Sequence, residues 1–345
     1  MTDVINTTAA FQVTEMSQVA AARRAALLLA QRSGFSESRS GQVELVVSEL
    51  ATNLARHARS GEMLFRRIGD ERIKHDPVGV EILAIDAGPG MPDIALFRRD
   101  GHSTAGTLGQ GLGAIERQSH AFEIDTRPAG TVALARIWRD APPGRAGQPL
   151  FEAGAVHVSK AGEAICGDDW ACRIREDRVA VMVADGLGHG LAAHDAAHLA
   201  VQIFERSVDE SPLHIVTDLH AGLRSTRGAA VAVAVIDVAR GILRCSGLGN
   251  ISSAIVTASG ERRSLVSQNG TAGHTAPRIQ EFAYPMPRGS FVVMHSDGVG
   301  MQWDVAAHAG LSNRHPSVIA GALYRQASRR RDDATVVIVK ERTPA

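Results

Sequence analysis

The sequence lacks a net charge, a cysteine framework and any long apolar run. Lysine plus arginine number 37, as do aspartate plus glutamate, so the summed charge gives no reason to expect nucleic acid or an anionic membrane as a partner. The three cysteines, Cys166, Cys172 and Cys245, form neither an even set nor a pair of C-x-x-C motifs, which argues against a disulfide framework and a structural zinc site. The ligand must therefore be inferred from local sites.

Targeting and membrane signals are also missing. The N-terminal segment has no basic start followed by an apolar core and a small-residue cleavage site, and no apolar run approaches the roughly 20 residues that a membrane helix needs. The final residues, ERTPA, form no targeting signal. We expect a cytoplasmic protein without a membrane partner.

The 345 residues are enough for two ordinary domains, and one segment separates them. Residues 140–150 (DAPPGRAGQPL) contain paired prolines, two glycines and few apolar side chains, a composition typical of a linker. The predicted domains are residues 1–139 and 151–345. Helical and strand-like patterns occur in both, so the predicted fold class is α+β in two domains.

Hydrophobic periodicity predicts the main elements of each domain. The first domain has predicted helices over 16–30 and 41–58 and predicted strands over 80–86, 122–125 and 131–138. The second has predicted strands over 179–184, 230–238, 291–295 and 335–339 and a predicted helix over 191–206.

The helix predicted over 41–58 carries a carboxylate and an amide on one side. Apolar residues between Val43 and Leu54 form one stripe, and Glu49 and Asn53 lie one turn apart at its edge. Taken alone, such a pair is more often a solvated helix flank than a site.

Two glycine-rich segments follow this helix. Asp86 ends a predicted strand, and the next residues, AGPGM, form a turn where the backbone can approach a ligand closely. Further on, Gly106, Gly109, Gly111 and Gly113 lead into a helix start, whose unpaired N–H groups can bind phosphate. Their spacing fits neither the G-x-G-x-x-G nor the G-x-x-x-x-G-K-[ST] pattern, and glycines alone also suit simple turns.

Together these pieces resemble the GHKL-type ATP-binding domain of the small anti-sigma-factor serine kinases, over residues 10–139. The helix motif is matched by ELATN (49–53), the first glycine box by DAGPGM (86–91) and the second by GQGLG (109–113). The resemblance implies an α/β sandwich with helices on one face of a mixed sheet, ATP with Mg²⁺ as cofactor, and serine kinase activity.

The resemblance also implies a role for each motif residue. Glu49 would be the general base that deprotonates the substrate serine, and Asn53 would help hold Mg²⁺ on the ATP phosphates. Asp86 would accept a hydrogen bond from the adenine amino group, with Gly130-Thr131 nearby. The other expected nucleotide-binding residues are Gly88, Gly90, Gly109, Gly111 and Gly113. His57, one further turn along the helix, is expected to be structural.

Four aspartate motifs follow in the second domain, each at an end of a strand-like run. They are CGDD (166–169), ADGLGHG (184–190), HSDG (295–298) and RDDAT (331–335). Strand ends let side chains from distant parts of a chain converge, and converging aspartates repel one another unless cations neutralise them. Oxygen ligands favour Mg²⁺ or Mn²⁺ over zinc. A single Asp-Gly pair is more often a turn, but four in order indicate a site.

These motifs resemble the SpoIIE-like branch of the PPM-type serine/threonine phosphatases, over residues 151–341. The resemblance implies an α-β-β-α sandwich and two cations, Mn²⁺ or Mg²⁺, about 3.5–4 Å apart, which activate a water for in-line attack on phosphoserine. The implied metal-binding groups are the carboxylates of Asp168, Asp185, Asp297 and Asp332 and the carbonyl of Gly186. Cys166 replaces a glycine common in the family, which leaves Asp168 in place.

Other polar residues in these motifs are expected outside the metal site. Asp169 and Asp333 are the less favoured members of their pairs. A lone histidine after a glycine turn or in a helix is more often structural than a ligand, so His189 and His194 are not assigned to the metals.

A kinase-like and a phosphatase-like domain in one chain predict opposing control of a phosphoserine on a partner. The resemblance implies a bacterial partner-switching system in which that partner is a STAS-domain anti-sigma-factor antagonist. Kinases of this group often pair, so a homodimer is also expected. Two alternatives remain: a phosphatase whose first domain only senses ATP, and a non-catalytic protein that sequesters a partner. The intact aspartates argue against the second.

Overall fold

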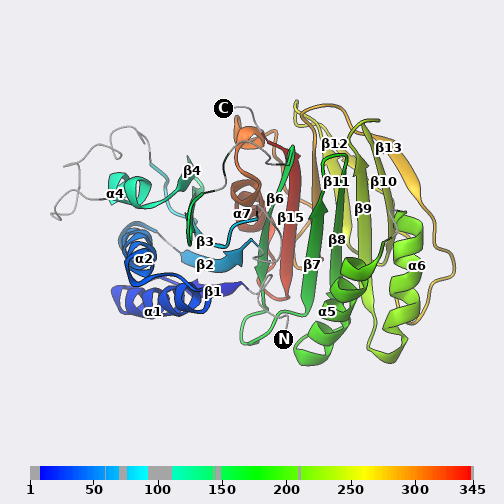
Figure 1. Cartoon of the computed structure of the whole chain (residues 1–345), viewed down its shortest axis with the longest axis horizontal. Helices are drawn as coiled ribbons and strands as arrows, with labels where there is room; N and C mark the ends of the chain where they lie inside the picture. The colour runs from blue at the N-terminus through cyan, green and yellow to red at the C-terminus, as the bar shows by residue number, and fades with distance from the viewer. Residues whose placement is uncertain are drawn as a thin grey trace. The chain divides into compact units, whose positions relative to one another are not determined.

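The computed structural model of the protein describes residues 8–58, 60–69, 76–91, 111–142, 144, 149–208 and 211–342. The chain forms two compact units, Met1–Gln148 and Pro149–Ala345, called here the N-terminal and C-terminal units and drawn in Figure 1. The division falls within the segment 140–150. None of the helices in the described residues is long and apolar enough to cross a membrane.

The N-terminal unit is a five-stranded sheet with helices on one face. Its elements are β1 (Ala9–Gln12), α1 (Met16–Arg32), α2 (Glu37–His57), β2 (Gly61–Ile68), β3 (Gly79–Asp86), α4 (Gly111–Gln118), β4 (Ala121–Arg127) and β5 (Gly130–Trp138). The strand order is β1-β2-β3-β5-β4. A mixed sheet was expected, but every described pairing is antiparallel. The reason is that β5 lies between β3 and β4, which run in the same direction and never pair.

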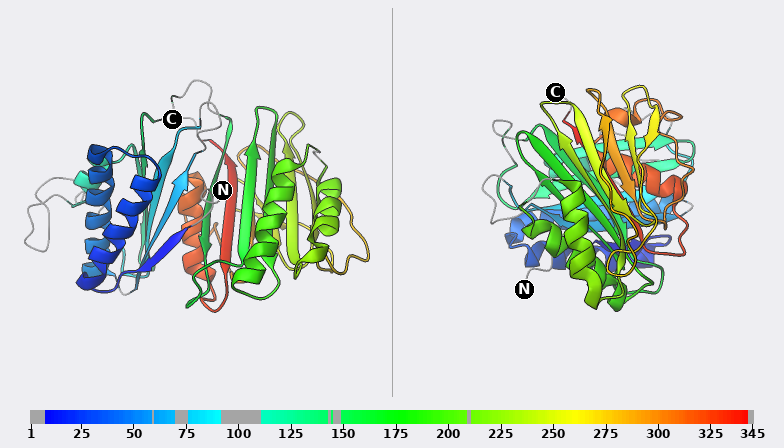
Figure 2. Two further views of the ribbon diagram at one scale, coloured as in Figure 1. Left: turned by 60° about the horizontal axis from the view of Figure 1, so that its bottom comes forward. Right: turned by 90° about the vertical axis from the view of Figure 1, so that its right-hand side faces the viewer.

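The core of this unit lies between the helices and the sheet. Figures 1 and 2 show the helices on one side of the strands. Helix α2 begins after Ser36, whose hydroxyl accepts a hydrogen bond from the Arg39 N–H at 3.3 Å, a typical N-cap. Its fully buried Val46 and Val47 join Phe65 of β2 in the apolar core. The apolar stripe predicted for this helix is thus its buried face, which leaves Glu49 and Asn53 partly exposed.

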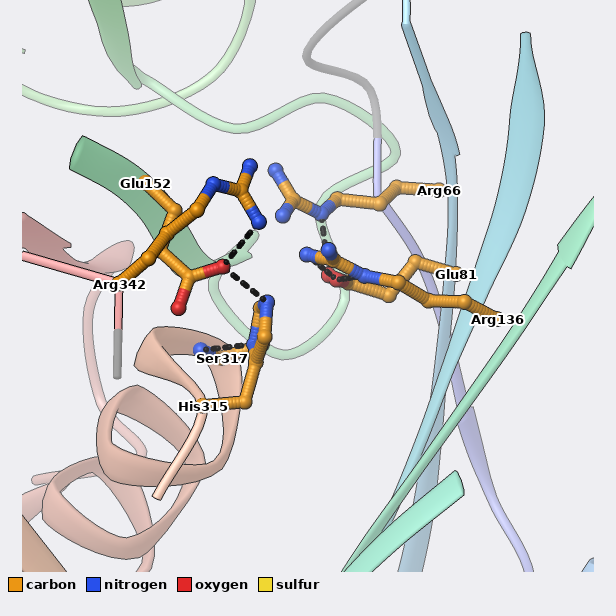
Figure 3. A network of polar contacts seen from close by, with 7 residues as sticks. All are labelled: Arg66, Glu81, Arg136, Glu152, His315, Ser317 and Arg342. Atoms are coloured by element: carbon orange, nitrogen blue, oxygen red, sulfur yellow. Dashed lines mark hydrogen bonds and ion pairs between the residues drawn. The ribbon is translucent and has the colours of Figure 1, made fainter. Parts of the chain in front are cut away.

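A buried charge ladder crosses the same sheet. Arg66 of β2, Glu81 of β3 and Arg136 of β5 are cross-strand neighbours. Glu81 is 1% exposed, and its two carboxylate oxygens accept from Arg66 Nε at 2.6 Å and Arg136 Nε at 2.7 Å (Figure 3). Each guanidinium therefore has a carboxylate partner, which offsets the cost of taking these charges out of water.

The C-terminal unit contains two antiparallel sheets of five strands. Their orders are β13-β10-β9-β8-β7 and β12-β11-β14-β15-β6. The strands are β6 (Phe151–Val158), β7 (Asp168–Ile174), β8 (Arg178–Gly186), β9 (Ala229–Asp237), β10 (Ile242–Leu248), β11 (Ser252–Val256), β12 (Arg262–Ser264), β13 (Phe282–Pro285), β14 (Phe291–His295) and β15 (Ala334–Glu341). The helices are α5 (Leu191–Arg206), α6 (Pro212–Gly222) and α7 (Pro316–Ala327), with 3₁₀ turns η1 (Leu223–Ser225) and η2 (Leu311–Asn313).

These elements form four layers, the expected α-β-β-α sandwich. Helix α5 packs on β7 and β8 of the first sheet, α6 packs on β9 and β10 of the same sheet, and α7 packs on β6 and β15 of the second (Figure 1). Strand β8 shows why: Val181 and Val183 enter the core between the sheets, whereas Met182 enters the core under the helices. A strand buried on both faces is apolar at every position, and such a run is what predicted a strand over 179–184.

A smaller group of ion pairs in the C-terminal unit connects strand β6 to the N-terminus of α7. Glu152 of β6 pairs with Arg342 at 2.9 Å and with the His315 ring at 3.5 Å (Figure 3). The other ring nitrogen of His315 accepts from the Ser317 N–H at 3.0 Å and so caps the N-terminus of α7.

Candidate functional site

In the N-terminal unit, Asp86 ends β3 and organises the first glycine segment. Its Oδ1 accepts hydrogen bonds from the Gly88 N–H at 2.6 Å and from the Thr131 N–H at 3.3 Å. Among the described residues Oδ2 has no recorded hydrogen-bond partner, and Asp86 is partly exposed. One carboxylate oxygen thus fixes the loop, while the other remains an acceptor for the amino group of a ligand.

Glycine is required at two positions around this carboxylate. Gly90 has φ +74°, and a Cβ there would lie 2.1 Å from the Arg127 carbonyl oxygen. Gly130 has φ +132°, and a Cβ there would lie 2.0 Å from the Asp86 carbonyl oxygen. Both contacts are with backbone and cannot move aside, so the two loops approach each other only because these residues lack side chains.

Two threonines complete this part of the site. Thr126 and Thr131 are directly opposite in the β4–β5 hairpin, and their hydroxyl oxygens are 3.0 Å apart. The Thr126 hydroxyl also accepts from the Met91 N–H at 2.8 Å, which ties the glycine segment to the sheet. Thr126 was not among the predicted site residues, because it lies just beyond the strand predicted over 122–125, whereas β4 continues to Arg127.

The end of α2 lies beside the same loop. A Cβ on Gly88 would be 3.2 Å from the carbonyl oxygen of His57, and Asn53 and Glu49 precede His57 by one and two helical turns. Neither Glu49 nor Asn53 has a recorded hydrogen-bond or ion-pair partner among the described residues. Both partly exposed side chains are therefore available to a ligand.

The second glycine segment is described only from its helix onward. Helix α4 begins at Gly111, packs against α2 and buries Gly113. Gly109 lies outside the described residues. The structure thus places the Gly88 and Thr131 N–H groups at the Asp86 carboxylate and Gly90 against the Arg127 carbonyl. Helices α2 and α4 pack together in the same unit.

In the C-terminal unit, the four predicted aspartates come from strand ends of both sheets. Asp168 begins β7 and lies directly opposite Asp185, the penultimate residue of β8. Asp297 follows β14, and Asp332 precedes β15. Strands β14 and β15 are antiparallel neighbours, so the end of one and the start of the other meet at one edge.

Asp168 is the most deeply buried member of this group, at 1% exposure. Burial raises its pKa to about 7 against the hydrogen bonds of Ser296 and Thr335, which lower it, and the charges of Asp333 and Asp297 raise it further. The Ser296 hydroxyl donates to its Oδ2 at 2.6 Å and accepts from the Thr335 N–H at 3.0 Å. A hydroxyl has one proton to donate, so this relay fixes the orientation of Asp168.

The other carboxylates show the same mutual repulsion. Burial raises the pKa of Asp185 to about 9, and the charges of Asp168, Asp297, Asp332 and Asp333 add to the rise. Burial and then Asp332 raise the pKa of Asp297, whose Oδ2 also accepts from Asn250 Nδ2 at 2.8 Å. Without a cation these groups retain protons at pH values where exposed aspartates are ionised.

Asp333 belongs to this acidic cluster more closely than sequence analysis expected. It is 4% exposed, and its Oδ1 accepts from the Lys160 N–H at 2.8 Å. Its Oδ2 is buried with no hydrogen-bond partner among the described residues, and a Cβ on Gly167 would lie 2.7 Å from it. By contrast, Asp169 is engaged structurally, by the Trp170 N–H at 2.8 Å and the His198 ring at 3.2 Å.

These oxygen donors fit hard divalent cations. The group contains carboxylates whose repulsion a cation would relieve, an orphaned buried oxygen on Asp333, and Gly186 at the end of β8. A Cβ on Gly186 would lie 2.0 Å from the Ala193 carbonyl oxygen, so its neighbour α5 packs directly on the backbone there. Among the described residues, no group of three or more histidine, cysteine, aspartate or glutamate side chains is arranged so that it could hold a metal ion; Mg²⁺ commonly takes one or two carboxylates and keeps several waters.

The two histidines near this cluster have protein partners. His189 Nδ1 lies 2.7 Å from Glu163 Oε1, and His194 Nδ1 lies 3.0 Å from the Cys166 carbonyl oxygen. The His194 ring also stacks on His198, with centroids 5.6 Å apart. These contacts support their expected structural role.

Two family models match the chain. Residues 13–137 match the histidine kinase-like ATPase domain, and residues 175–342 match stage II sporulation protein E (SpoIIE). Among curated proteins, the serine/threonine-protein kinase RsbT of Bacillus subtilis (strain 168) is 33% identical over 121 residues, which cover 35% of this chain and 88% of the relative.

Solved structures also resemble the chain. One described as "The bacterial stressosome: a modular system that has been adapted to control secondary messenger signaling" is 27% identical with a TM-score of 0.51, and the match covers 55% of this chain and 99% of that one. RsbX in complex with magnesium is 20% identical with a TM-score of 0.49, and the match covers 55% and 95%. The chain belongs to the RsbT-related family of histidine kinase-like ATPases through its N-terminal unit, to which a SpoIIE-type phosphatase domain of the PPM class is joined.

Proposed function

We propose that the C-terminal unit is a phosphoserine phosphatase that works with two divalent cations, Mn²⁺ or Mg²⁺. The observation that carries this proposal is the group of aspartates from two sheets, among them the buried Asp168 and the partly buried Asp185 and Asp297, whose charges raise one another's pKa values. When bound, the cations would supply charge neutralisation and Lewis-acid activation of water. The groups proposed to hold them are Asp168, Asp185, Asp297, Asp332 and the Gly186 carbonyl.

The protein's own residues have distinct tasks in this site. The Ser296 relay keeps one oxygen of Asp168 occupied and leaves its other oxygen for a cation. Asn250 does the same for Asp297. Close packing of α5 on Gly186 holds the end of β8 in place. Such rigid ligands lower the reorganisation that the reaction would otherwise require.

We propose that the N-terminal unit binds ATP with Mg²⁺ and transfers phosphate to a serine. In this role the free oxygen of Asp86 accepts from the adenine amino group, Asn53 holds Mg²⁺, and Glu49 is the general base. Gly88, Gly90, Gly109, Gly111, Gly113 and Thr131 line the nucleotide site. The specific support is that Glu49 and Asn53 have no recorded protein partner on a helix whose end abuts the Asp86 loop.

The substrate proposed for both activities is a partner protein of the STAS-domain anti-sigma-factor antagonist class. The chain would then be a bacterial partner-switching regulator that sets the phosphorylation of one serine from both directions. A domain that only senses ATP is the alternative for the N-terminal unit.

The phosphatase is tested with the purified chain, Mn²⁺, an aryl phosphate and a phosphoserine peptide, with and without ATP. The expected result is Mn²⁺-dependent turnover that is lost in Asp185→Asn. Absence of turnover in the metal-loaded wild-type protein would contradict the proposal. A change in turnover on adding ATP would show that the N-terminal unit regulates the phosphatase.

The kinase is tested separately by transfer of labelled γ-phosphate to a STAS-domain protein, using Asp185→Asn to prevent its removal. Transfer that disappears in the additional Glu49→Ala variant supports the kinase. ATP binding without transfer in either protein would leave the sensor alternative in its place.

A further inference from the structure

The turn between α7 and β15 contains three consecutive arginines. Helix α7 ends at Ala327 and β15 begins at Ala334, and Arg329, Arg330 and Arg331 between them are all exposed. We call residues 328–331 the arginine turn. It leads directly into Asp332, so it is covalently attached to the acidic cluster.

One backbone hydrogen bond holds this turn beside another proposed metal ligand, and a second bond closes the turn on itself. The Arg329 N–H donates to the Gly298 carbonyl at 2.9 Å, one residue after Asp297. The Arg330 N–H donates to the Ser328 hydroxyl at 3.2 Å. The Arg329 backbone is therefore bonded to the residue that follows Asp297, and Arg329 precedes Asp332 by three residues.

The conformation of the turn is unusual. Arg330 has φ +52° and is the one non-glycine residue with positive φ in the described part of the chain. This left-handed conformation is unfavourable for a side chain with a Cβ, and such residues concentrate at functional sites. An ordinary loop between a helix and a strand would place glycine or asparagine there.

The three guanidinium groups are also available. None of them has a recorded hydrogen bond or ion pair with another described residue. Arg329 is nevertheless close to the cluster, because its backbone N–H is bonded to the carbonyl of Gly298, the residue after Asp297. An exposed arginine that reaches an acidic site without pairing can bind an anion that enters the site.

We propose that Arg329 binds the phosphoryl group of the phosphoserine substrate at the rim of the aspartate cluster. The proposal rests on the phosphatase function proposed above. A guanidinium offers two parallel N–H donors that match two phosphoryl oxygens, and it can remain hydrogen-bonded as charge moves onto the leaving serine oxygen. Arg330 and Arg331 extend the positive surface along which a phosphorylated segment approaches.

The test compares Arg329→Ala and Arg329→Lys in the full-length, Mn²⁺-loaded chain. Since the phosphoryl group is common to all substrates, kcat/KM should fall roughly 10- to 100-fold for both an aryl phosphate and a phosphoserine peptide in Arg329→Ala. Inhibition by inorganic phosphate should weaken by a similar factor. Lysine should restore part of both losses, because it keeps the charge without the planar fork.

Arg224→Ala is the matched control, since Arg224 is an exposed arginine of η1 with no recorded partner among the described residues. It should leave kcat/KM and phosphate inhibition unchanged. The proposal is overturned if Arg329→Ala behaves like this control, or if it weakens peptide turnover alone, which would move the contact to the peptide. A wild-type protein without turnover would refute the phosphatase instead, and calorimetric titration of inorganic phosphate into wild type and Arg329→Ala would still decide the contact.

Discussion

Asp86 in the N-terminal unit and Asp168 in the C-terminal unit both stand at a strand terminus, yet their surroundings differ. Asp86 is partly exposed and accepts from two backbone N–H groups. Asp168 is buried among other aspartates, and its pKa is raised to about 7. One oxygen of Asp86 is satisfied by the backbone before any ligand binds, whereas the aspartates around Asp168 repel one another in a way that a cation would relieve. The two sites should therefore respond differently to the same kind of change.

The largest effect on activity is expected when one negative charge is removed from the aspartate cluster of the C-terminal unit. Asp297→Asn should lower phosphatase kcat/KM by roughly 10³-fold or more, because a lost cation ligand forfeits several kcal/mol of charge stabilisation. Its amide oxygen can still accept from Asn250, so the fold should persist. ATP affinity, measured by calorimetry, should not change.

Asp177→Asn provides the control for that experiment, since Asp177 precedes β8 at the opposite end from Asp185 and its side chain is 72% exposed. It should retain full turnover. Equal losses in both variants would contradict a local role for Asp297.

The buried ion pairs give the next comparison. Glu81→Gln should lower the free energy of unfolding of the N-terminal unit by about 3–5 kcal/mol, because the carboxylate shared by Arg66 and Arg136 is lost from a buried position. Glu152→Gln should cost about 1 kcal/mol or less, since the side chain of its partner Arg342 is 37% exposed. Hydrogen exchange resolved by unit during denaturant unfolding measures both, and similar costs would refute the distinction.

A smaller effect is expected at Asp86. In Asp86→Asn the amide oxygen can still accept from the Gly88 and Thr131 N–H groups, but the negative charge is lost. ATP affinity should fall roughly 10- to 100-fold, the usual size of one hydrogen bond to a charged group. Turnover of an aryl phosphate without ATP should remain at the wild-type rate. A loss of that turnover would show that the two sites are not chemically separate.

The smallest expected effect is the change in Mn²⁺ affinity of the aspartate cluster per pH unit. In the metal-free folded protein the pKa values of Asp168 and Asp185 are about 7 and about 9. In the unfolded chain an aspartate has a pKa of about 3.9. The folded state therefore holds more protons, so its stability falls as pH rises from about 4 to about 9. Cations displace those protons, so apparent Mn²⁺ affinity should rise by up to about tenfold per unit between pH 7 and 9.

Calorimetry or Mn²⁺-dependent thermal shifts across this pH range measure that trend. Asp185→Asn removes the group with the higher pKa and should flatten the upper part of the curve. An Mn²⁺ affinity that falls with rising pH would contradict proton displacement.

Local patterns predicted much of the fold. The continuous apolar runs of β8 and β9, the stripe of α2 and the linker-like composition of 140–150 each depend on neighbouring residues. Each predicted helix and strand is present, as are the two layered folds implied by the resemblance. The strands that were not predicted include two kinds. Strands β12 and β13 are short and partly exposed, so neither has a strong period. Strands β2 and β6 are longer and mostly buried, but charged residues or glycine interrupt their apolar pattern. The antiparallel pairing throughout the first sheet depends on the insertion of β5, which no local pattern records.

For the sites, the sequence alone determined the chemical groups and their order: Asp86 before a glycine turn, and four aspartate motifs at strand ends. Their roles in binding and catalysis stay predictions. Tertiary structure alone decided which groups are paired and which remain available. Ser296 reaches Asp168 across 128 positions of sequence, Asp333 joins the acidic cluster, and Arg329 lies beside Asp297. Burial, repulsion and hydrogen bonding depend on distances in space, and those distances exist only after the strands have assembled.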